Sequence, residues 1–447
     1  MNPETQAAVD ELRKLITMSG TINMEVFYWW CTAIMVLIHA GFLAYEMGAS
    51  RVKNALASGV KNILAFAFIV PTFFLFGWWI YLAFPGGLTP AESGDAGLPW
   101  ATAMGPNLAD NASGVFWAAF TMFAATTASI LSGALIERIR LSAFIILAIL
   151  LGSVIWILAA SWGWHPAGWL HTKLGLHDVA AAGCVHVIAG FFALGVVINL
   201  GPRIGRFMPD GTAVDIPGHS VPMTLIGLMI IIVGFFGFLG GCIIYVTGDQ
   251  WINIYGQPAT LSAFAFNTLM SFAGGIIGCF LMTRDPFWMM SGALAGIISA
   301  ASGLDVYHPA LAFLIGFIGG CIIPKVQDIL VKLKLDDAVG AFAVHGAAGT
   351  WSLIAAGIFA SGYPSAAGPE SSLYGQLVSW VVFAGLGFVP GFVVSYVLKL
   401  FGLLRITPGA EIAGLDLVEI PLKPYPEGLT PATNGNGHVA PQGAPAE

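Results

Sequence analysis

The sequence predicts an all-α polytopic membrane protein with eleven transmembrane helices, arranged as an inverted five-plus-five repeat plus one extra helix. Three observations carry this prediction: the composition, the spacing of the apolar runs, and a repeated segment that contains a histidine. Of the 447 residues, 57% are hydrophobic and 9% are charged, and the mean hydropathy is +0.82. Soluble domains carry about 25% charged residues. Soluble enzymes and nucleic-acid-binding proteins are therefore excluded, and no nucleic-acid partner is expected.

Eleven apolar runs are long enough to cross about 30 Å of hydrocarbon as helices. They cover residues 23–45, 62–84, 114–136, 141–164, 179–201, 221–246, 259–282, 287–303, 308–324, 338–361 and 373–401. The runs predict an N-terminal segment (1–22), a first five-helix repeat (23–201), a loop (202–220), a second five-helix repeat (221–361), an eleventh helix (373–401) and a tail (402–447). Their continuity excludes alternating strands.

The two terminal segments differ from the apolar runs. Residues 1–22 lack the long apolar core of a signal peptide and predict a short surface helix ahead of the first span. In the tail, the polar stretch 407–427 carries apolar anchors at Ile412, Leu415, Leu417 and Ile420 that are expected to pack on the cytoplasmic face. From about residue 429 the Gly, Pro, Asn and Ala content predicts disorder.

Basic residues predict the orientation, because Lys and Arg concentrate in cytoplasmic loops. With the N-terminus outside and the C-terminus inside, 14 of the 17 basic residues are assigned to the inner side. They are Arg51, Lys53, Lys61, Arg138, Arg140, Arg203, Arg206, Arg284, Lys325, Lys332, Lys334, Lys399, Arg405 and Lys423. An even number of spans would break this pattern. We therefore expect a multi-pass protein of the cell membrane, surrounded by lipid, with its N-terminus outside and its C-terminus in the cytoplasm.

Cofactor and metal motifs are not expected in this chain. The five cysteines lie in apolar runs without a CxxC pair, so they are interpreted as small core residues. His165, His171 and His177 are evenly spaced, but they lie in a loop segment with no acidic or cysteine partner, so they too are interpreted as structural. A phosphate-binding GxxxxGK[ST] motif is absent. The sequence predicts neither an enzyme, nor a cofactor, nor a metal site.

An internal repeat carries the chemistry. DVAAAGCVHVIAG, starting at Asp178, aligns without gaps with DAVGAFAVHGAAG, starting at Asp337, and six of thirteen residues are identical. One copy opens the fifth span and the other the tenth, so the two copies enter the membrane from opposite sides. This pattern is typical of inverted-topology repeats, whose substrate path lies at the interface of the two halves near the midplane.

The histidines of the repeat, His186 and His345, each follow an aspartate by eight residues. A helical rise of 1.5 Å per residue places each imidazole about 12 Å into the membrane. Two neutral imidazoles at this depth can hydrogen-bond to each other and still face a ligand. Ionisable residues inside a bilayer are costly and usually functional, so a pore role is favoured over simple packing. Asp178 and Asp337 lie at helix N-termini, where a capping role is sufficient, although Asp178 could also attract cations from outside.

Several further segments carry a resemblance to a known family. They are HAGFLAYEMGASRVKN after the first span, SGALIERIR after the third, GWHPAGWL before the fifth, FGFLGG in the sixth, AFNT in the seventh, DDAVGAFAVHGAAGTW into the tenth and IAGLDL in the tail. From about Glu25 to Glu419 the chain resembles the ammonium transporter (Amt/Rh) family. The resemblance implies a protomer of eleven helices with a pore through its own centre, assembled as a homotrimer that carries ammonium or ammonia.

Site residues follow from this resemblance one at a time. His186 and His345 match the twin pore histidines, and Asp178 matches the family aspartate. Phe123 and Phe238 match the two stacked phenylalanines that gate the outer end of the pore. Trp164 matches the tryptophan beside the external cation site, where aromatic faces attract a cation by up to about 2 kcal/mol.

The chain also departs from the family pattern around this outer vestibule. Cys242 stands where the family usually has a serine, and Ala119-Phe120 stands where it usually has Phe-Gln. Leu239 replaces the usual asparagine of the sixth span. These changes remove polarity from the vestibule formed by Trp164, Cys242 and Phe120. The tail keeps GLDL but not the usual continuation, which bears on whether a cytoplasmic regulator of the PII type binds there.

Three alternatives remain beside ammonium transport. A relative retuned to a methylated or larger amine would explain the lost polar groups together with the retained aromatic rings. A sensor or transceptor would bind ammonium and signal through its tail, although no output domain follows Arg405. An electron carrier with haem between His186 and His345 is disfavoured, because the Gly/Ala-rich segments around both histidines leave little room for a porphyrin.

Overall fold

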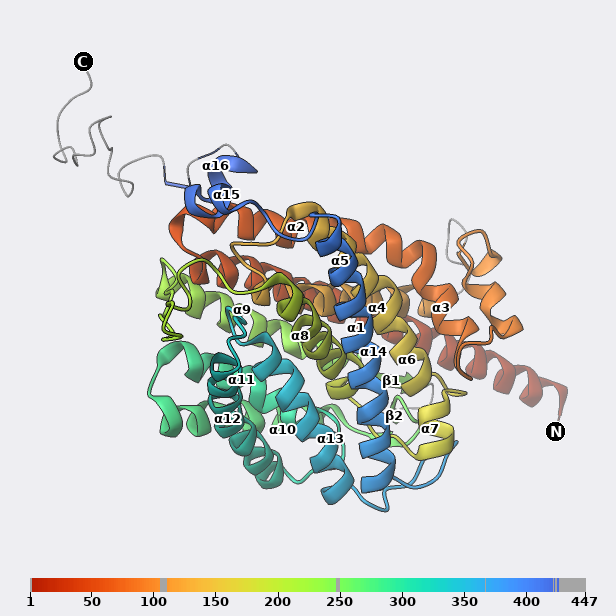
Figure 1. The fold of residues 1–447 in the computed structure, drawn as a ribbon. Coiled ribbons are helices and arrows are strands. Elements are labelled where there is room, and N and C mark those ends of the chain that lie inside the picture. The colour runs from red at the N-terminus through yellow and green to blue at the C-terminus, as the bar shows by residue number, and fades with distance from the viewer. Residues whose placement is uncertain are drawn as a thin grey trace, which may run out of the picture.

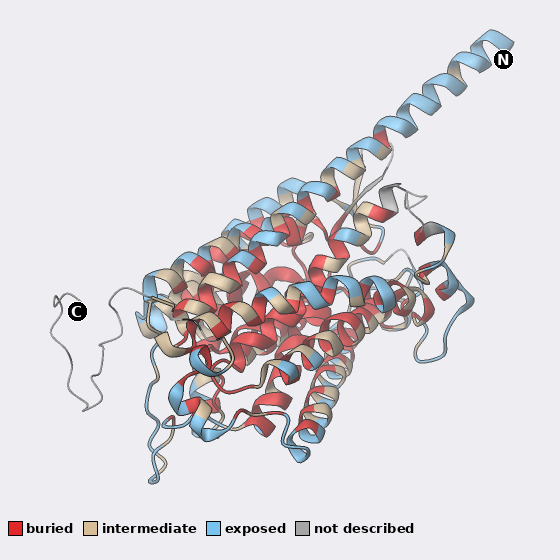
Figure 2. Ribbon diagram, turned by 90° about the horizontal axis from the view of Figure 1, so that it is seen from above, coloured by how far each residue is buried: buried red, intermediate tan, exposed pale blue. Residues whose placement is uncertain are grey.

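The computed structural model describes residues 2–104, 111–246, 250–365, 367–420, 422 and 424–425. Within these residues the chain forms a bundle of long helices (Figure 1), with buried residues at its centre and exposed residues around it (Figure 2). Ten helices are long and apolar enough to cross a membrane, and α11 (Pro286–Ala301) is apolar but has 16 residues. The predicted fold class, an all-α polytopic membrane protein, is therefore confirmed.

The first half of the chain supplies five spans. Its helices are α1 (Pro3–Ala49), α2 (Ala55–Thr72), α3 (Trp78–Ala83), α4 (Asn111–Ala134), α5 (Leu141–Leu150), α6 (Trp156–Gly163), α7 (Trp169–Leu174) and α8 (Ile188–Leu200). Two π-helical turns, η2 (Phe73–Gly77) and η5 (Leu151–Ile155), join neighbouring helices into single spans, and a third, η6 (Ala182–Val187), opens the fifth span and leads into α8. Short 3-10 segments are η1 (Val52–Asn54), η3 (Glu92–Gly97) and η4 (Thr102–Met104).

The second half repeats this plan and adds a tail. Its helices are α9 (Val221–Gly240), α10 (Leu261–Thr283), α11, α12 (Pro309–Lys332), α13 (Ala348–Phe359) and α14 (Leu373–Leu400), and the π-helical turn η7 (Phe342–Ala347) leads into α13. The tail holds α15 (Pro408–Ala413) and α16 (Leu415–Val418). The expected disorder from residue 429 lies outside the described residues.

The prediction of a separate surface helix over residues 1–22 is wrong. Helix α1 runs without interruption from Pro3 to Ala49, and its first part projects from the bundle as an exposed helix (Figure 2). Asn2 caps the helix by accepting a hydrogen bond from the Glu4 backbone N–H, and Pro3 occupies the first turn, where its missing N–H costs nothing. No proline follows inside the helix, and Gly20 does not end it.

The sixth span ends earlier than predicted. Helix α9 stops at Gly240, and the expected helical residues up to 246 instead form strand β1 (Ile243–Val246). Strand β1 pairs antiparallel with β2 (Gln250–Asn253), which pairs antiparallel with β3 (Pro258–Ala259). The Gly240–Gly241 pair weakens the helix at this point, and the β-branched residues that follow favour a strand. The Tyr28 hydroxyl of α1 donates to the Ile243 carbonyl at 2.6 Å and ties β1 to the bundle.

Glycines set the closest helix contacts. Helix α1 packs along α9, and a Cβ built at Gly41 would lie 2.7 Å from the Gly227 carbonyl oxygen. Helix α10 packs along α12 in the same way, where a Cβ at Gly316 would lie 2.5 Å from the Ser271 carbonyl oxygen. Small residues at such crossings let membrane helices approach closely, because packing replaces the hydrophobic driving force in lipid.

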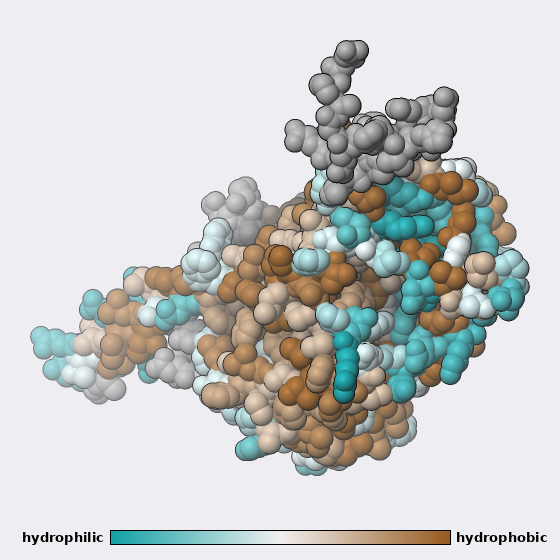
Figure 3. All heavy atoms as spheres, turned by 90° about the vertical axis from the view of Figure 1, so that its left-hand side faces the viewer, coloured by the Kyte–Doolittle hydropathy of each residue, from teal (hydrophilic) through white to brown (hydrophobic). Residues whose placement is uncertain are grey.

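One end of the bundle is rich in basic side chains, and we call it the basic face: Arg51, Arg138, Arg203 and Arg405. Figure 3 looks toward the left-hand side of Figure 1, and hydrophilic side chains gather on one part of it while hydrophobic ones cover most of the rest. The assignment of Lys61 to an inner loop is wrong. This lysine lies inside α2 and is 1% exposed.

The tail packs on the basic face through two of the four predicted anchors. Leu415 is fully buried in a small cluster with Ala57 and Ile406, and Ile420 packs against this cluster, whereas Ile412 and Leu417 are more than 60% exposed. Polar contacts also hold the segment. The Asp416 carboxylate accepts the Leu56 and Ala57 backbone N–H groups at 3.1 and 2.8 Å, capping the start of α2.

Candidate functional site

The two copies of the repeat build the same local structure. The Asp178 carboxylate accepts the backbone N–H groups of Gly183 and Cys184 at 2.9 and 3.0 Å. The Asp337 carboxylate accepts those of Ala341 and Phe342 at 2.9 and 2.7 Å. Each aspartate therefore satisfies N–H groups at the start of a π-helical turn, which would otherwise be unpaired in the membrane.

Each copy needs one residue in the left-handed backbone region between the aspartate and the turn. In the first copy this residue is Ala181, with φ 69°, and in the second it is Gly340, with φ 74°. The positive φ reverses the chain so that the carboxylate can fold back onto the helix start. Glycine adopts this conformation at little cost, whereas alanine does so with strain.

The π-helical turns η6 and η7 carry His186 and His345. The two Nδ1 atoms are 3.0 Å apart, and the rings lie nearly parallel with centroids separated by 5.1 Å. One ring must donate its N–H to the bare nitrogen of the other. His186 is fully buried, His345 is 6% exposed, and the Nε2 atom of His186 has no hydrogen-bond partner among the described residues. A buried, unsatisfied nitrogen at this point can face a ligand.

Reciprocal glycine contacts bring the two copies together. A Cβ at Gly190 would fall against the backbone nitrogen of Gly346, and a Cβ at Gly349 would lie 2.7 Å from the Ala182 carbonyl oxygen. Each copy thus packs its glycine against the π-helical turn of the other. With imidazoles at hydrogen-bond distance and backbones this close, no porphyrin fits between the histidines, so the arrangement argues against the haem alternative.

Aromatic rings close one side of the histidine pair. The rings of Phe123 and Phe238 have centroids 4.2 Å apart, and Phe238 lies 5.9 Å from the His186 ring. Trp156, which the sequence reasoning did not single out, stacks on Phe123 at 6.1 Å and 2°. Phe123, Phe238 and Trp156 are all fully buried, so the rings fill the space next to the histidines in this conformation.

The predicted vestibule residues lie directly beyond this pair of rings. Phe120 contacts both Phe123 and Trp164 with centroids 5.8 Å away, and Trp164 lies edge-on to Phe123 at 5.7 Å. The Trp164 Nε1–H donates to the Asp178 backbone carbonyl at 2.8 Å, which ties the ring to the first copy of the repeat. The structure therefore brings Phe120, Phe123, Trp164 and Asp178 together.

Cys242 follows α9 and is 1% exposed. Its thiol donates to the Phe238 carbonyl at 3.4 Å, one helical turn back. This bond holds the sulfur against its own chain, and a thiol is a weaker acceptor than a hydroxyl. At the position where the family resemblance implies a serine hydroxyl, the chain therefore has a weaker acceptor, and its S–H group is already bonded to the Phe238 carbonyl.

The interpretation that the loop histidines have no acidic partner is wrong. The His177 Nε2 atom lies 3.0 Å from Asp305, and Asn253 donates to the same carboxylate at 2.7 Å. Tyr255 stacks on His171 at 4.5 Å and accepts the Asp178 backbone N–H at 3.1 Å. Sequence spacing could not reveal this cluster, because its members come from three separate segments.

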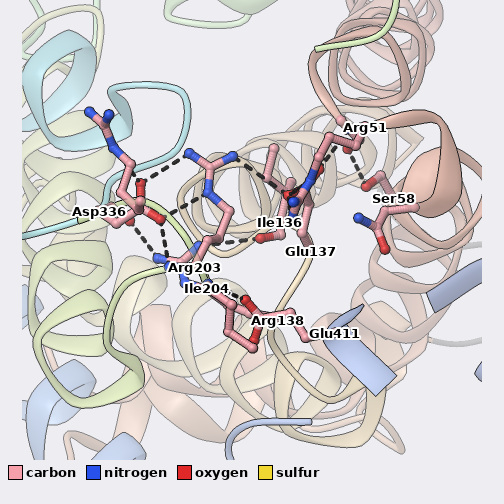
Figure 4. Close-up of polar contacts among 12 residues, drawn as sticks. Arg51, Ser58, Ile136, Glu137, Arg138, Arg203, Ile204, Asp336 and Glu411 are labelled. Carbon is pink, nitrogen blue, oxygen red and sulfur yellow. Dashed lines mark hydrogen bonds and ion pairs between the residues drawn. The ribbon is translucent and has the colours of Figure 1, made fainter. Parts of the chain in front are cut away.

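An ionic network on the basic face holds the segment that leads into η7 (Figure 4). Arg203 lies between two carboxylates: its Nε donates to Asp336 at 2.8 Å, and its NH1 lies 3.8 Å from Glu137. Glu137 also accepts the Arg51 guanidinium at 2.8 Å. The Glu411 carboxylate of the tail accepts the Ile204 backbone N–H at 2.7 Å, which connects the tail to this network.

The arginines of this network lower the pKa values of two carboxyl groups, those of Asp336 and Glu137. Burial alone would raise the pKa of Asp336, but Arg138 and Arg203 outweigh it and hold this pKa well below its usual range. Burial likewise opposes ionisation of Glu137, yet Arg51 and Arg203 keep the pKa of Glu137 lowered. Both groups are therefore carboxylates at neutral pH, and they fix the backbone ahead of Asp337.

Fold and site together define a polytopic membrane protein that encloses a polar pair at the meeting point of two helix repeats. The chain belongs to the Ammonium Transporter Family, whose sequence model matches residues 26–425. It is 31% identical over 440 residues to ammonium transporter Amt2 of Archaeoglobus fulgidus, covering 92% of this chain and 90% of that protein. It is 30% identical over 420 residues to the ammonium transporter of Bacillus subtilis, covering 90% and 98%.

Solved structures agree with this assignment. A protein described as a sensor Amt protein superposes with a TM-score of 0.79 at 27% identity, covering 90% of this chain and 99% of that chain. Candida albicans Mep2 superposes with a TM-score of 0.71 at 23% identity, covering 86% of each chain, and shares the fold. Members of this family are transporters or channels, so the chain is a multi-pass membrane protein of that kind and not an enzyme.

Proposed function

We propose that this chain carries ammonium across the membrane by passing ammonia along His186 and His345. The observation that supports this proposal best is the buried imidazole pair, with Nδ1 atoms 3.0 Å apart, next to the Phe123 and Phe238 rings, which are in contact but tilted by 49° and not stacked as expected. An imidazole pair offers hydrogen bonds to a small polar molecule where the surrounding wall is apolar. Membership of an ammonium transporter family agrees with this substrate.

Ammonium is drawn first to the aromatic vestibule around Trp164 and Phe120. Ring faces attract a cation that is losing water, and the Asp178 carboxylate adds negative potential from behind the Trp164 contact. Ammonium then releases a proton near Phe123 and Phe238 and continues as ammonia. Sodium and potassium ions cannot become neutral in this way, so an apolar passage rejects them.

The proposal includes the orientation and assembly of the protein. The basic face lies in the cytoplasm of a cell-membrane protein with its N-terminus outside, because basic side chains favour that side. Three copies assemble as a homotrimer, each with its own passage, as the family resemblance implies. A regulator of the PII type would reach the passage through the tail, since Glu411 and Asp416 already tie the tail to the loops of the basic face.

Uptake in cells that lack other ammonium carriers tests this proposal. Expression of the chain should restore growth at limiting ammonium, whereas the His186→Ala/His345→Ala variant should not, with both proteins detected in the membrane. Absence of rescue by the wild type at normal membrane levels would overturn the proposal. A sensor without transport activity would bind ammonium in the purified state and still fail this assay.

A methylated amine is the second candidate substrate, and Cys242 favours it. The thiol is bonded to the Phe238 carbonyl, and Phe120 occupies the centre of the vestibule rings, so few acceptors remain for the N–H groups of ammonium. Aromatic faces bind methylated cations without such acceptors. Competition of ammonium, methylammonium and choline for uptake separates the two candidates: ammonium transport predicts that ammonium competes best.

A further inference from the structure

A second polar cluster lies inside the spans, away from the histidine pair. Four buried side chains from three helices form it, and we call it the Glu46 cluster: Glu46 of α1, Lys61 and Asn62 of α2, and Ser132 of α4. Their exposed fractions are 0%, 1%, 3% and 0%, respectively. Neither charged residue of this cluster has a role in the passage described above.

The contacts of the cluster leave one group unsatisfied. The Glu46 carboxylate accepts the Asn62 side-chain amide at 3.0 Å through one oxygen and the Ser132 hydroxyl through the other. The Lys61 Nζ atom has no hydrogen-bond partner among the described residues and lies 6.0 Å from the centre of the Phe144 ring. Of the charged groups nearby, Lys61 acts most strongly on Glu46, and Glu46 acts most strongly on Lys61.

Stability does not explain such a pair. Removing two charges from water costs several kcal/mol per ion, so apolar residues of similar size would stabilise the helices at least as well. Inside a bilayer, ionisable residues mark ion or proton paths more often than structural contacts. Lys61 makes no hydrogen bond to Glu46, but its positive charge acts on the carboxylate through space, and its three N–H donors have no partner among the described residues.

The cluster lies next to the segment that carries His345. Gly133 of α4 has no side chain, and a Cβ built there would be 3.5 Å from a Glu46 carboxylate oxygen and 2.6 Å from a Val339 methyl group. Val339 lies between Asp337 and η7, on the basic-face side of His345. The glycine therefore leaves Glu46 beside the inner end of the proposed passage, where a larger residue would separate the two.

Other titratable groups lie close enough to the cluster to interact with it electrostatically. Glu46 and Asp337 both act on Tyr45 of α1. Besides Glu46, the charges of Glu419, Arg138 and Glu137 act on Lys61. Along α1, two turns before Glu46, the His39 Nδ1 atom lies 3.4 Å from the Ser129 hydroxyl. Ser129 in turn offers its backbone carbonyl to Ser132 at 2.7 Å.

We propose that Glu46, held by Asn62 and Ser132, is the proton-exchange site at the basic-face end of the passage. This inference rests on the ammonium transport proposed above. The Glu46 carboxyl gives its proton to ammonia that has passed the histidines: the carboxyl O–H bond breaks, an N–H bond forms, and a carboxylate and ammonium remain. The proton released from the next ammonium at the aromatic end restores the carboxyl. The Lys61 charge keeps the carboxylate form available between cycles.

The test uses the full-length protein in lipid vesicles with two readouts on the same preparation. Ammonium-driven current reports movement of charge, and the change of internal pH in an ammonia gradient reports movement of neutral ammonia. Glu46→Gln should lower the current at least tenfold and leave ammonia flux within twofold of the wild type. Glu46→Asp, which keeps an ionisable carboxyl, should recover a substantial part of the current.

Asp416→Asn is the matched control, because it makes the same carboxyl-to-amide change at a buried carboxylate outside the Glu46 cluster, where the tail caps α2. It should leave the ratio of current to flux unchanged. If Glu46→Gln does not assemble, Lys61→Met takes its place: the carboxyl then keeps its proton, so the current should fall and recover at higher pH. A structural pair would alter yield and leave the current per protein and its pH profile unchanged.

Failure of the inference and of the proposed function remain distinguishable. A wild type with ammonia flux and no current, or variants with an unchanged ratio of current to flux, overturn the role of Glu46 and leave the transport function in place. A wild type with neither current nor flux overturns the proposed function itself and the inference with it.

Discussion

The two copies of the internal repeat share one local plan and differ in their surroundings. Both use an aspartate, a left-handed residue and a π-helical turn to present a histidine. Around the first copy, Asp178 is enclosed by the Ser302 hydroxyl at 2.9 Å and by Tyr255 and Trp164 at its backbone. Around the second, the neighbouring Asp336 binds Arg203 of the basic-face network.

This difference shows how one motif can be placed in two settings. The motif itself presents an imidazole from a π-helical turn, because its own backbone and carboxylate satisfy the start of the turn. Its surroundings then differ: aromatic rings lie around the first copy, which the proposed function makes the cation-attracting end, and ion pairs lie around the second.

Loss of either histidine should have the largest effect, because the pair works as a unit across the two copies. Coupling between contacting residues reaches about 3 kcal/mol, so His186→Ala or His345→Ala should each lower ammonium uptake on the order of a hundredfold. The double variant should be little worse than either single one. Initial rates of uptake measure this. Two single variants with unchanged rate and selectivity would contradict a shared role, as would a strictly additive double variant.

We expect the next largest effect, a loss of stability, when the glycine contact between the two copies is disturbed. Gly190→Ala pushes a methyl group against the Gly346 backbone, and overpacking of this kind costs about 1–3 kcal/mol. Thermal unfolding of the detergent-purified protein measures the loss. Gly385→Ala is the matched control, because a Cβ at Gly385 meets no atom within 4 Å. Equal midpoints for the two variants would show that the copies are less tightly packed than described.

We expect the stability of the protein at acid pH to depend on Asp336, beside the second copy, with an effect smaller than that of the glycine substitution. The pKa of Asp336 is lowered in the folded protein, so its stabilising contribution is complete above the unfolded pKa of about 4 and is lost as the pH falls toward the folded pKa. The unfolding midpoint of the wild type should therefore begin to drop below about pH 5 and keep dropping as the pH falls toward the lowered folded pKa. Asp336→Asn should flatten this dependence while lowering stability at pH 7. A variant with the wild-type pH slope would exclude Asp336 as the cause.

The left-handed residues should give the smallest effect, with opposite signs in the two copies. Ala181→Gly relieves strain at φ 69° and should stabilise the protein by about 0.5–1 kcal/mol. Gly340→Ala should destabilise it by at least that amount, since the new Cβ also meets the Trp288 ring at 2.7 Å. Unfolding midpoints of the two variants provide the measurement. A loss of stability in Ala181→Gly would mean that unfolded-chain entropy outweighs the strain.

Much of the fold could be predicted from the sequence because membrane spans are long and apolar. Lipid cannot satisfy backbone N–H and C=O groups, so each apolar run of about 20 residues must be helical. Errors arose where local chemistry competes with that rule. The end of the sixth span became strand β1 after Gly240–Gly241, and Lys61 was assigned to a loop although α2 buries it. A charge inside a span is rare, which made the loop assignment the simpler expectation.

For the site, the sequence by itself determined the repeat, because a shared Asp, a shared His and an odd number of spans between the copies constrain where two imidazoles can lie. Tertiary structure alone decided the partners of these residues. The stacking of Trp156 on Phe123, the pairing of His177 with Asp305, and the close approach of Val339 and Glu46 to Gly133 join segments far apart in the chain. Contacts of this kind depend on which helix faces meet, and helix packing, not the order of residues along one span, sets those faces.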